Sequence, residues 1–105
     1  MELTVIERMA ILNLLGPEGE LIYLRAKREI VKKVGLSANE IKKWNVGEKD
    51  GNMIMDPQEN WQKITEISLL GGEAAIIAEA LTTKLTDTKK LHENELALYE
   101  KFVEK

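Results

Sequence analysis

The apolar positions of residues 4–34 recur at helical spacing and predict two helices. Thr4 and Glu7 have the spacing of a capping box, in which a hydroxyl and a carboxylate each bind an amide of the first turn. The wide apolar stripe that follows predicts a largely buried helix ending at Gly16-Pro17, where Gly16 can take the left-handed conformation. A second helix is predicted from about Glu20 to Val34. Its core face carries Tyr23, Ala26, Ile30 and Val34, with Leu24 and Val31 beside them.

A short third helix is predicted from about Ala38 to Asn45. Ser37 and Glu40 have capping-box spacing, and Leu36 and Ile41 occupy the two apolar positions that fix the direction in which the chain enters the helix. The connection from the second helix is only a few residues long and contains glycine. This is the layout of a helix-turn-helix.

Residues 47–70 interrupt the helical pattern and favour strands. Asp50-Gly51 is typical of a tight turn with positive backbone angles. Asn52–Met55 is a short strand candidate. A second candidate runs from Trp61 to Leu69, with Trp61, Thr65, Ile67 and Leu69 on one side. We expect these two strands to form a hairpin across a loop at Asp56–Asn60.

Helical spacing returns after Gly71-Gly72. A helix is predicted from about Glu73 to Leu85, and a last one begins at His92 as N-cap with Glu95 three positions later. The predicted fold class is therefore α+β and mostly helical, with about five helices and one β-hairpin between the third and fourth. We find no linker or repeat, so residues 1–105 are expected to form a single domain.

Composition sets limits on the class of protein. The chain has 105 residues, 44% of them apolar, and a formal net charge of −3, which is typical of one folded domain. It contains no cysteine, which excludes disulfides and thiolate chemistry. No apolar run approaches the roughly 18 to 20 residues that span a bilayer, and the first residues lack the plan of a signal peptide. We expect a cytoplasmic protein that does not enter membranes.

A local basic stretch stands out against the acidic total. From Arg25 to Lys43 the chain has seven basic and two acidic residues, so this stretch carries +5. Because lysine and arginine contacts to phosphates dominate nucleic-acid affinity, it is a candidate surface for double-stranded DNA. The alternative is an ordinary solvated helix surface, which the absence of arginine from the predicted recognition helix favours. The candidate nucleic-acid-binding residues are Arg25, Arg28, Lys32, Lys33, Lys42 and Lys43.

Other residue types suggest chemistry only weakly. His92 near Glu95 resembles a general base with an orienting carboxylate, but a histidine at a helix start explains it as well. Asp50, Asn52 and Asp56 miss the calcium-loop spacing, and turn formation accounts for them. Gly71-Gly72 before a helix is a weak anion-site pattern. Trp44 and Trp61 could stack on bases, although core or interface packing is the commoner use of tryptophan. We expect no catalytic, cofactor-binding or metal-binding residues, and no enzymatic activity.

The order of motifs resembles small proteins of unknown function encoded by phages and prophages. The matching segments are Ala10–Leu15, Gly35–Ser37, Glu40-Ile41 and Leu98–Phe102, which together span most of the chain. The resemblance implies a phage or prophage context and brings no site residues with it. Separately, helices followed by a hairpin look like a winged helix, although fold alone does not fix function.

The sequence therefore predicts a non-catalytic accessory protein that acts through protein contacts. Trp44 and Met55 are the candidate exposed apolar residues for such contacts. The alternative is a winged-helix-type DNA-binding regulator that uses the helix around Ser37–Trp44 together with the basic stretch. A homodimer through the two C-terminal helices is also expected, because small domains often bury too little surface alone.

Overall fold

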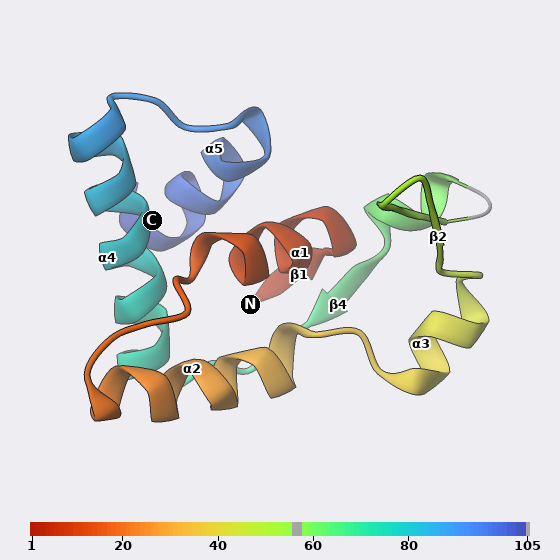
Figure 1. The fold of residues 1–105 in the computed structure, drawn as a ribbon, viewed down its shortest axis with the longest axis horizontal. Helices are drawn as coiled ribbons and strands as arrows, with labels where there is room; N and C mark the ends of the chain where they lie inside the picture. Colours follow the sequence, from red (N-terminus) through yellow and green to blue (C-terminus); the bar gives the residue numbers. More distant parts are fainter. Residues whose placement is uncertain (56–57, 105) are drawn as a thin grey trace.

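The computed structural model describes residues 1–55 and 58–104. Helix α1 (Val5–Leu14) lies in the middle of the molecule. Helix α2 (Leu21–Val34) runs along one side of it, and α4 (Gly71–Thr88) and α5 (Glu93–Tyr99) cover another side (Figure 1). The short helix α3 (Ala38–Lys43) and the irregular middle of the chain lie at the opposite end. The α+β, mostly helical class is confirmed.

The first residues form a strand that the apolar pattern did not predict. Strand β1 (Glu2–Thr4) pairs antiparallel with β4 (Ile64–Glu66), and Leu3 lies opposite Thr65. Leu3 is fully buried, while Glu2 is exposed. The pairing fixes the start of α1 beside β4, and the amide of Val5 continues it by donating to the Lys63 carbonyl at 3.1 Å.

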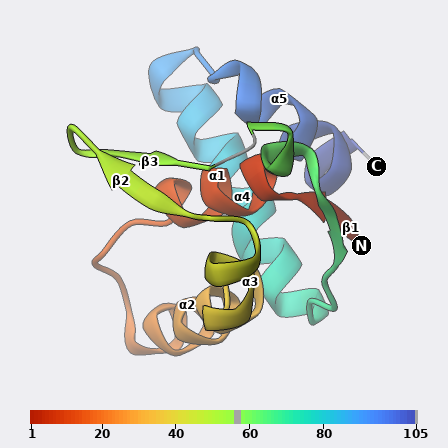
Figure 2. The same cartoon turned by 90° about the vertical axis from the view of Figure 1, so that its right-hand side faces the viewer.

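The predicted hairpin exists, but with different strands. Strands β2 (Gly47–Lys49) and β3 (Asn52–Ile54) pair antiparallel around Asp50-Gly51, whose φ angles of 53° and 79° confirm the predicted tight turn. The expected partner of β3, the segment 61–69, pairs with β1 instead, so that prediction was wrong. The hairpin projects from the body beside α3 (Figure 2).

The segment between β3 and β4 also differs from its prediction. Trp61 belongs to a short 3₁₀ helix, η1 (Gln58–Gln62), and not to a strand. The loop expected at 56–60 is therefore partly helical, and residues 56–57 lie outside the described residues. Farther on, Thr65 and Leu69 are half-buried and Ile67 is buried, which confirms the predicted inward side of this segment.

Two clusters of buried side chains share α1 between them. The larger cluster lies among α1, α2, α4, α5 and the π-helical end of the chain, η2 (Glu100–Glu104). Its buried members are Leu3, Ile11, Leu15, Ile30, Val34, Ile67, Ile77, Leu81, Leu98 and Phe102. The smaller cluster joins Val5 of α1 to Trp44 and Met55. The C-terminal helices therefore contribute apolar side chains to the core of their own chain, and a dimer through these helices stays a prediction.

The same contact stabilises the starts of α1, α3, α4 and α5. In each helix, a glutamate three residues after the N-cap accepts the N-cap amide at 2.8 or 2.9 Å. Each of these carboxylates also binds a cation from elsewhere in the chain, in the pairs Glu7–Lys101, Glu40–Arg8, Glu73–Lys33 and Glu95–Lys84. Local capping and tertiary contact are therefore combined in one side chain at each helix start.

Several details of the structure differ from the sequence predictions. Leu24 and Val31, placed beside the core face of α2, are 39% and 40% exposed. Trp44 and Met55, expected on the surface, are 7% and 3% exposed, because they fill the smaller cluster. Gly16 has no positive φ, since α1 ends at Leu14 and the chain leaves it in an extended conformation.

Candidate functional site

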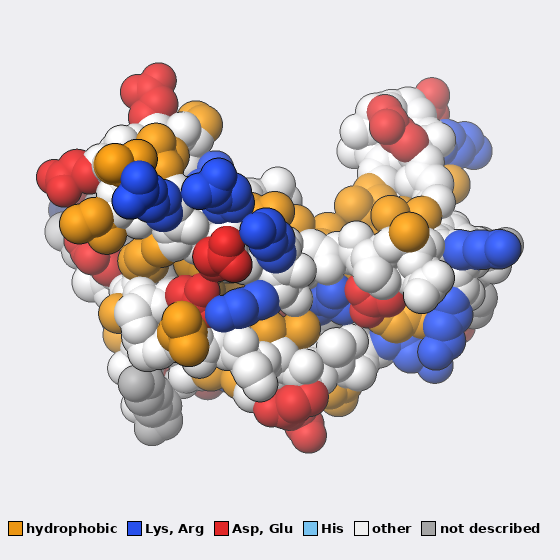
Figure 3. Space-filling view, turned by 90° about the horizontal axis from the view of Figure 1, so that it is seen from below, with side chains coloured by type: hydrophobic (Ala, Val, Ile, Leu, Met, Phe, Trp, Pro, Cys, Tyr) orange, Lys and Arg blue, Asp and Glu red, His pale blue; other side chains and the backbone are white. Residues whose placement is uncertain are grey.

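The six basic residues singled out in the sequence do not form one uniform surface. Arg25 and Arg28 are exposed on α2, and Lys42 and Lys43 are exposed at the end of α3. The other two are engaged by carboxylates, Lys32 by Glu29 at 3.2 Å and Lys33 by Glu73 at 2.6 Å. Figure 3 shows basic side chains over α2 with acidic ones among them, and a separate basic group on the side of α3 and the hairpin.

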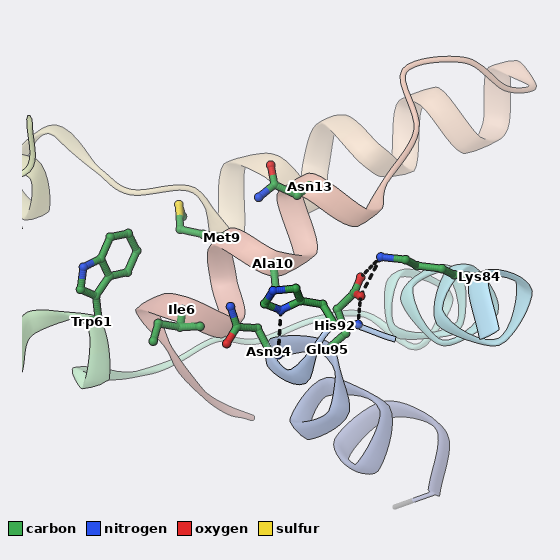
Figure 4. A pocket seen from close by; sticks show the side chains of 9 residues that line it. All are labelled: Ile6, Met9, Ala10, Asn13, Trp61, Lys84, His92, Asn94 and Glu95. Carbon is green, nitrogen blue, oxygen red and sulfur yellow. Dashed lines mark hydrogen bonds and ion pairs between the residues drawn. The ribbon is translucent and has the colours of Figure 1, made fainter. Parts of the chain in front are cut away.

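An open cleft lies along the solvent-facing side of α1, and we call it the α1 cleft. It has a volume of about 560 Å³. Ile6, Met9 and Ala10 of α1 form its floor, and the indole of Trp61 stands at one end (Figure 4). Trp61 reaches this position because η1 holds it against the smaller buried cluster.

The opposite end of the α1 cleft is polar. Its lining comes from α4, from the start of α5 and from the end of α1, and consists of Asn13, Lys84, His92, Asn94 and Glu95. His92 is the N-cap of α5, and its Nδ1 accepts the Asn94 amide at 3.2 Å. This bond accounts for His92 as a helix-start residue. Asn13 and Asn94 are exposed, and their side-chain amides make no hydrogen bond within the described part of the chain.

The two charged residues of the α1 cleft neutralise each other. Lys84 Nζ donates to both carboxylate oxygens of Glu95, at 2.7 and 2.8 Å. Burial raises the pKa of Glu95, but the hydrogen bonds from Lys84 and the His92 amide outweigh it, and the pKa is lowered overall. Near neutral pH the Glu95 carboxylate is therefore ionised and held in place by these hydrogen bonds, so it is a poor proton acceptor. The cleft consequently presents apolar surface and neutral polar groups.

A second cleft, here called the α2–α4 cleft, lies between the start of α2 and α4. It has a volume of about 730 Å³. Its apolar lining includes Leu14, Tyr23 and Ile76, and Ile22 at its edge is 79% exposed. Glu18, Glu20 and Glu79 complete a largely acidic rim. Tyr23 shapes this edge, because its hydroxyl donates to the Gly16 carbonyl at 2.8 Å.

Within the described part of the chain, the residues considered as metal or anion ligands do not gather into a site. Within residues 1–55 and 58–104, no group of three or more histidine, cysteine, aspartate or glutamate side chains could hold a metal ion. Asp50 forms the hairpin turn, and Asp56 lies outside the described residues. Gly71-Gly72 starts α4, where the Glu73 carboxylate already accepts the Leu70 amide.

No family model, curated protein or solved structure matches this chain. Its function therefore has to be argued from its own surfaces. Among the described helices, none combines the length and the apolar character needed to cross a membrane.

Sequence reasoning did not predict either cleft. Trp61 was identified as a residue for packing or stacking, but its place beside Met9 depends on η1 and on the strand pairing that follows it. No local pattern marked Ile22 either. It stands four positions before Ala26, at the spacing of the predicted core face, yet it is 79% exposed.

Proposed function

We propose that this chain is a non-catalytic accessory protein that binds a segment of another protein in the α1 cleft. The observation that carries the proposal is the apolar floor of Ile6 and Met9 beside the indole of Trp61. Tryptophan and methionine are enriched at protein interfaces, since they provide a large contact area, and methionine adapts its shape to the partner.

The polar end of the cleft supports a peptide as the ligand. The amides of Asn13 and Asn94 each offer donors and an acceptor, the combination that a peptide backbone needs. Lys84 and Glu95 neutralise each other, so the polar end of the cleft does not favour binding of a strongly charged small molecule. A bound segment would place one large apolar side chain against Trp61 and its backbone near the two asparagines.

The test is selection of peptides from a displayed random library on the purified chain. We expect the selected peptides to share one aromatic or large aliphatic anchor. In ¹H–¹⁵N correlation spectra, their binding should shift the Trp61 indole signal and the amides of Ile6 and Met9.

A blocking variant and a matched control locate the binding. Asn13 is exposed on α1, so Asn13→Arg places a long side chain across the cleft without disturbing the core. We expect affinity to fall at least about tenfold, which is a change that loss of one good contact produces. Asn39→Arg makes the same change at an exposed position of α3 and should leave affinity unchanged. Equal binding by both variants, or a library that yields no binders, would refute the proposal.

Binding of double-stranded DNA is the second candidate function. It is favoured by Arg25, Arg28, Lys42 and Lys43, which are exposed and make no ion pair within the described residues. It is disfavoured by the six-residue length of α3 and by the neutralisation of Lys32 and Lys33. Fluorescence anisotropy with a mixed-sequence duplex tests it. Binding that weakens steeply with salt and is lost in Lys42→Glu/Lys43→Glu would put this candidate first.

A further inference from the structure

We infer that the start of α2 forms a two-fold contact with a second copy of this chain. The surface consists of Leu21 and Ile22 in the first turn, with Glu18 on one side along the chain and Arg25 on the other. The proposal concerns the α2–α4 cleft and does not depend on what binds in the α1 cleft.

The apolar centre of this surface is largely uncovered by the described part of the chain. Leu21 is 62% exposed and Ile22 is 79% exposed, the latter the highest value among the exposed large apolar side chains of the described residues. Adjacent exposed apolar side chains at the edge of a cleft are typical of an interaction surface. Leu14, Tyr23 and Ile76 continue the apolar surface from Ile22 into the cleft.

The charges on either side of this centre are opposite. Glu18 and Glu20 precede it and Arg25 and Arg28 follow it, and all four are exposed. None of them makes an ion pair within the described part of the chain. The basic residues nearby are otherwise engaged, since Lys27 donates to the Gly16 carbonyl at 3.0 Å and Lys84 binds Glu95.

An acidic–apolar–basic order is self-complementary when two copies run antiparallel. Glu18 stands three positions before Leu21, and Arg25 stands three positions after Ile22. A two-fold axis between Leu21 and Ile22 therefore brings Glu18 of each copy opposite Arg25 of the other, and Leu21 of each copy opposite Ile22 of the other. In a two-fold contact every residue pair occurs twice, so the charges at both ends of the surface are paired at once.

The same charges disfavour the other ways of covering this surface. An acidic segment would be repelled by Glu18 and Glu20, and a basic segment by Arg25 and Arg28. A parallel arrangement of two copies would place like charges opposite each other. Because the contact involves one helical turn and the preceding loop, it is small, and we expect a weak dimer that forms at high protein concentration.

The first experiment is sedimentation equilibrium of the intact chain and of two matched variants. Ile22→Gln should shift the chain to monomer. Ile64→Gln replaces an isoleucine that is 62% exposed on β4, far from this surface in the sequence, and should leave the dimer unchanged. A chain that stays monomeric at concentrations up to about 1 mM, or a dimer that persists in Ile22→Gln, would overturn the proposal.

A charge swap tests the antiparallel register. Glu18→Arg and Arg25→Glu should each weaken dimerisation by about tenfold, because each change acts twice in the dimer and replaces attraction by repulsion. The combined Glu18→Arg/Arg25→Glu chain should recover the original dissociation constant within about threefold, since both pairs are restored with reversed sign. A combined variant that stays as weak as the single ones would refute this register. Circular dichroism of each variant checks that α2 is intact.

Discussion

Arg8 and Glu40, thirty-two positions apart, form a bidentate ion pair that joins α1 to α3. Both guanidinium Nη atoms donate to the Glu40 carboxylate at 2.9 Å, while Nε and Nη2 also donate to the Val34 and Gly35 carbonyls at 2.8 Å. Arg8 is only 2% exposed. One side chain therefore connects the start of the chain, the end of α2 and the start of α3.

Removing the arginine should destabilise the fold strongly. Arg8→Met retains the apolar volume but removes the cationic donor of the Glu40 carboxylate and of the Val34 and Gly35 carbonyls. We expect the free energy of unfolding to fall by about 3 kcal/mol, the usual cost of removing one partner of a buried pair. Urea denaturation measures it. Arg28→Met, at an exposed position of α2, is the control and should change stability by less than about 0.5 kcal/mol. Similar losses in both variants would contradict a structural role for the pair.

The same pair predicts how stability depends on pH. The side-chain hydrogen bond from Arg8 lowers the pKa of Glu40 from 4.5 to about 2 in the folded chain, although burial opposes the shift. Because the folded pKa is below the unfolded one, the stabilisation is complete above about pH 4.5. It is lost as the pH falls toward 2. We expect a decrease of about 2 kcal/mol, less than the full shift corresponds to, because the Glu40 side chain is partly exposed to solvent. Hydrogen bonds from Lys33 and Lys84 also keep the pKa values of Glu73 and Glu95 low, in the same direction.

Urea denaturation between pH 7 and pH 2 measures this dependence. Glu40→Gln lacks the ion pair with Arg8, so this variant should be less stable than the wild-type chain at neutral pH. Because glutamine does not titrate, the stability of the variant should decline less on acidification. If the wild-type chain and Glu40→Gln decline equally between pH 4.5 and pH 2, the pair does not contribute to the dependence.

His92 should matter for stability through its cap. His92→Ala removes the acceptor of the Asn94 amide, and loss of an N-cap side chain costs about 1 kcal/mol. His92→Asn provides another acceptor at the same place and should retain most of the stability. Thermal or urea unfolding compares the two. A His92→Asn chain as unstable as His92→Ala would show that the histidine acts by a route other than capping.

Leu3 of strand β1 should contribute as much to the free energy of unfolding as a buried residue of a core helix does. Leu3 is fully buried between β4 and the helices, so Leu3→Ala should lower the free energy of unfolding by about 3 kcal/mol. Glu2→Ala changes the neighbouring exposed residue of the same strand and should cost little. Hydrogen exchange of the β4 amides provides a second measurement, since loosening of β1 exposes them. A mild effect of Leu3→Ala would mean that β1 is dispensable.

Local patterns predicted the features that depend on neighbouring residues. The capping boxes at Thr4, Ser37 and His92 are all present, because a side chain and an amide three positions apart meet whenever the helix forms. The turn at Asp50-Gly51 is present for the same reason, since its backbone angles suit those two residues. The partner of each strand was not predictable in this way. β1 and β4 are separated by most of the chain, and three-residue strands carry too little pattern to identify each other.

The α+β class, most of the helix starts and the tight turn at Asp50-Gly51 could be predicted from the sequence alone, because they follow from interactions within a few residues. The burial of the apolar residues Trp44 and Met55 and the exposure of Ile22 depend on how distant elements pack together. The meeting of Trp61 with α1 in a cleft depends on the same packing. Burial depends on which elements pack against one another, and that choice is made by contacts between distant parts of the chain. Apolar residues of similar character therefore end in the core or on the surface according to their neighbours in space.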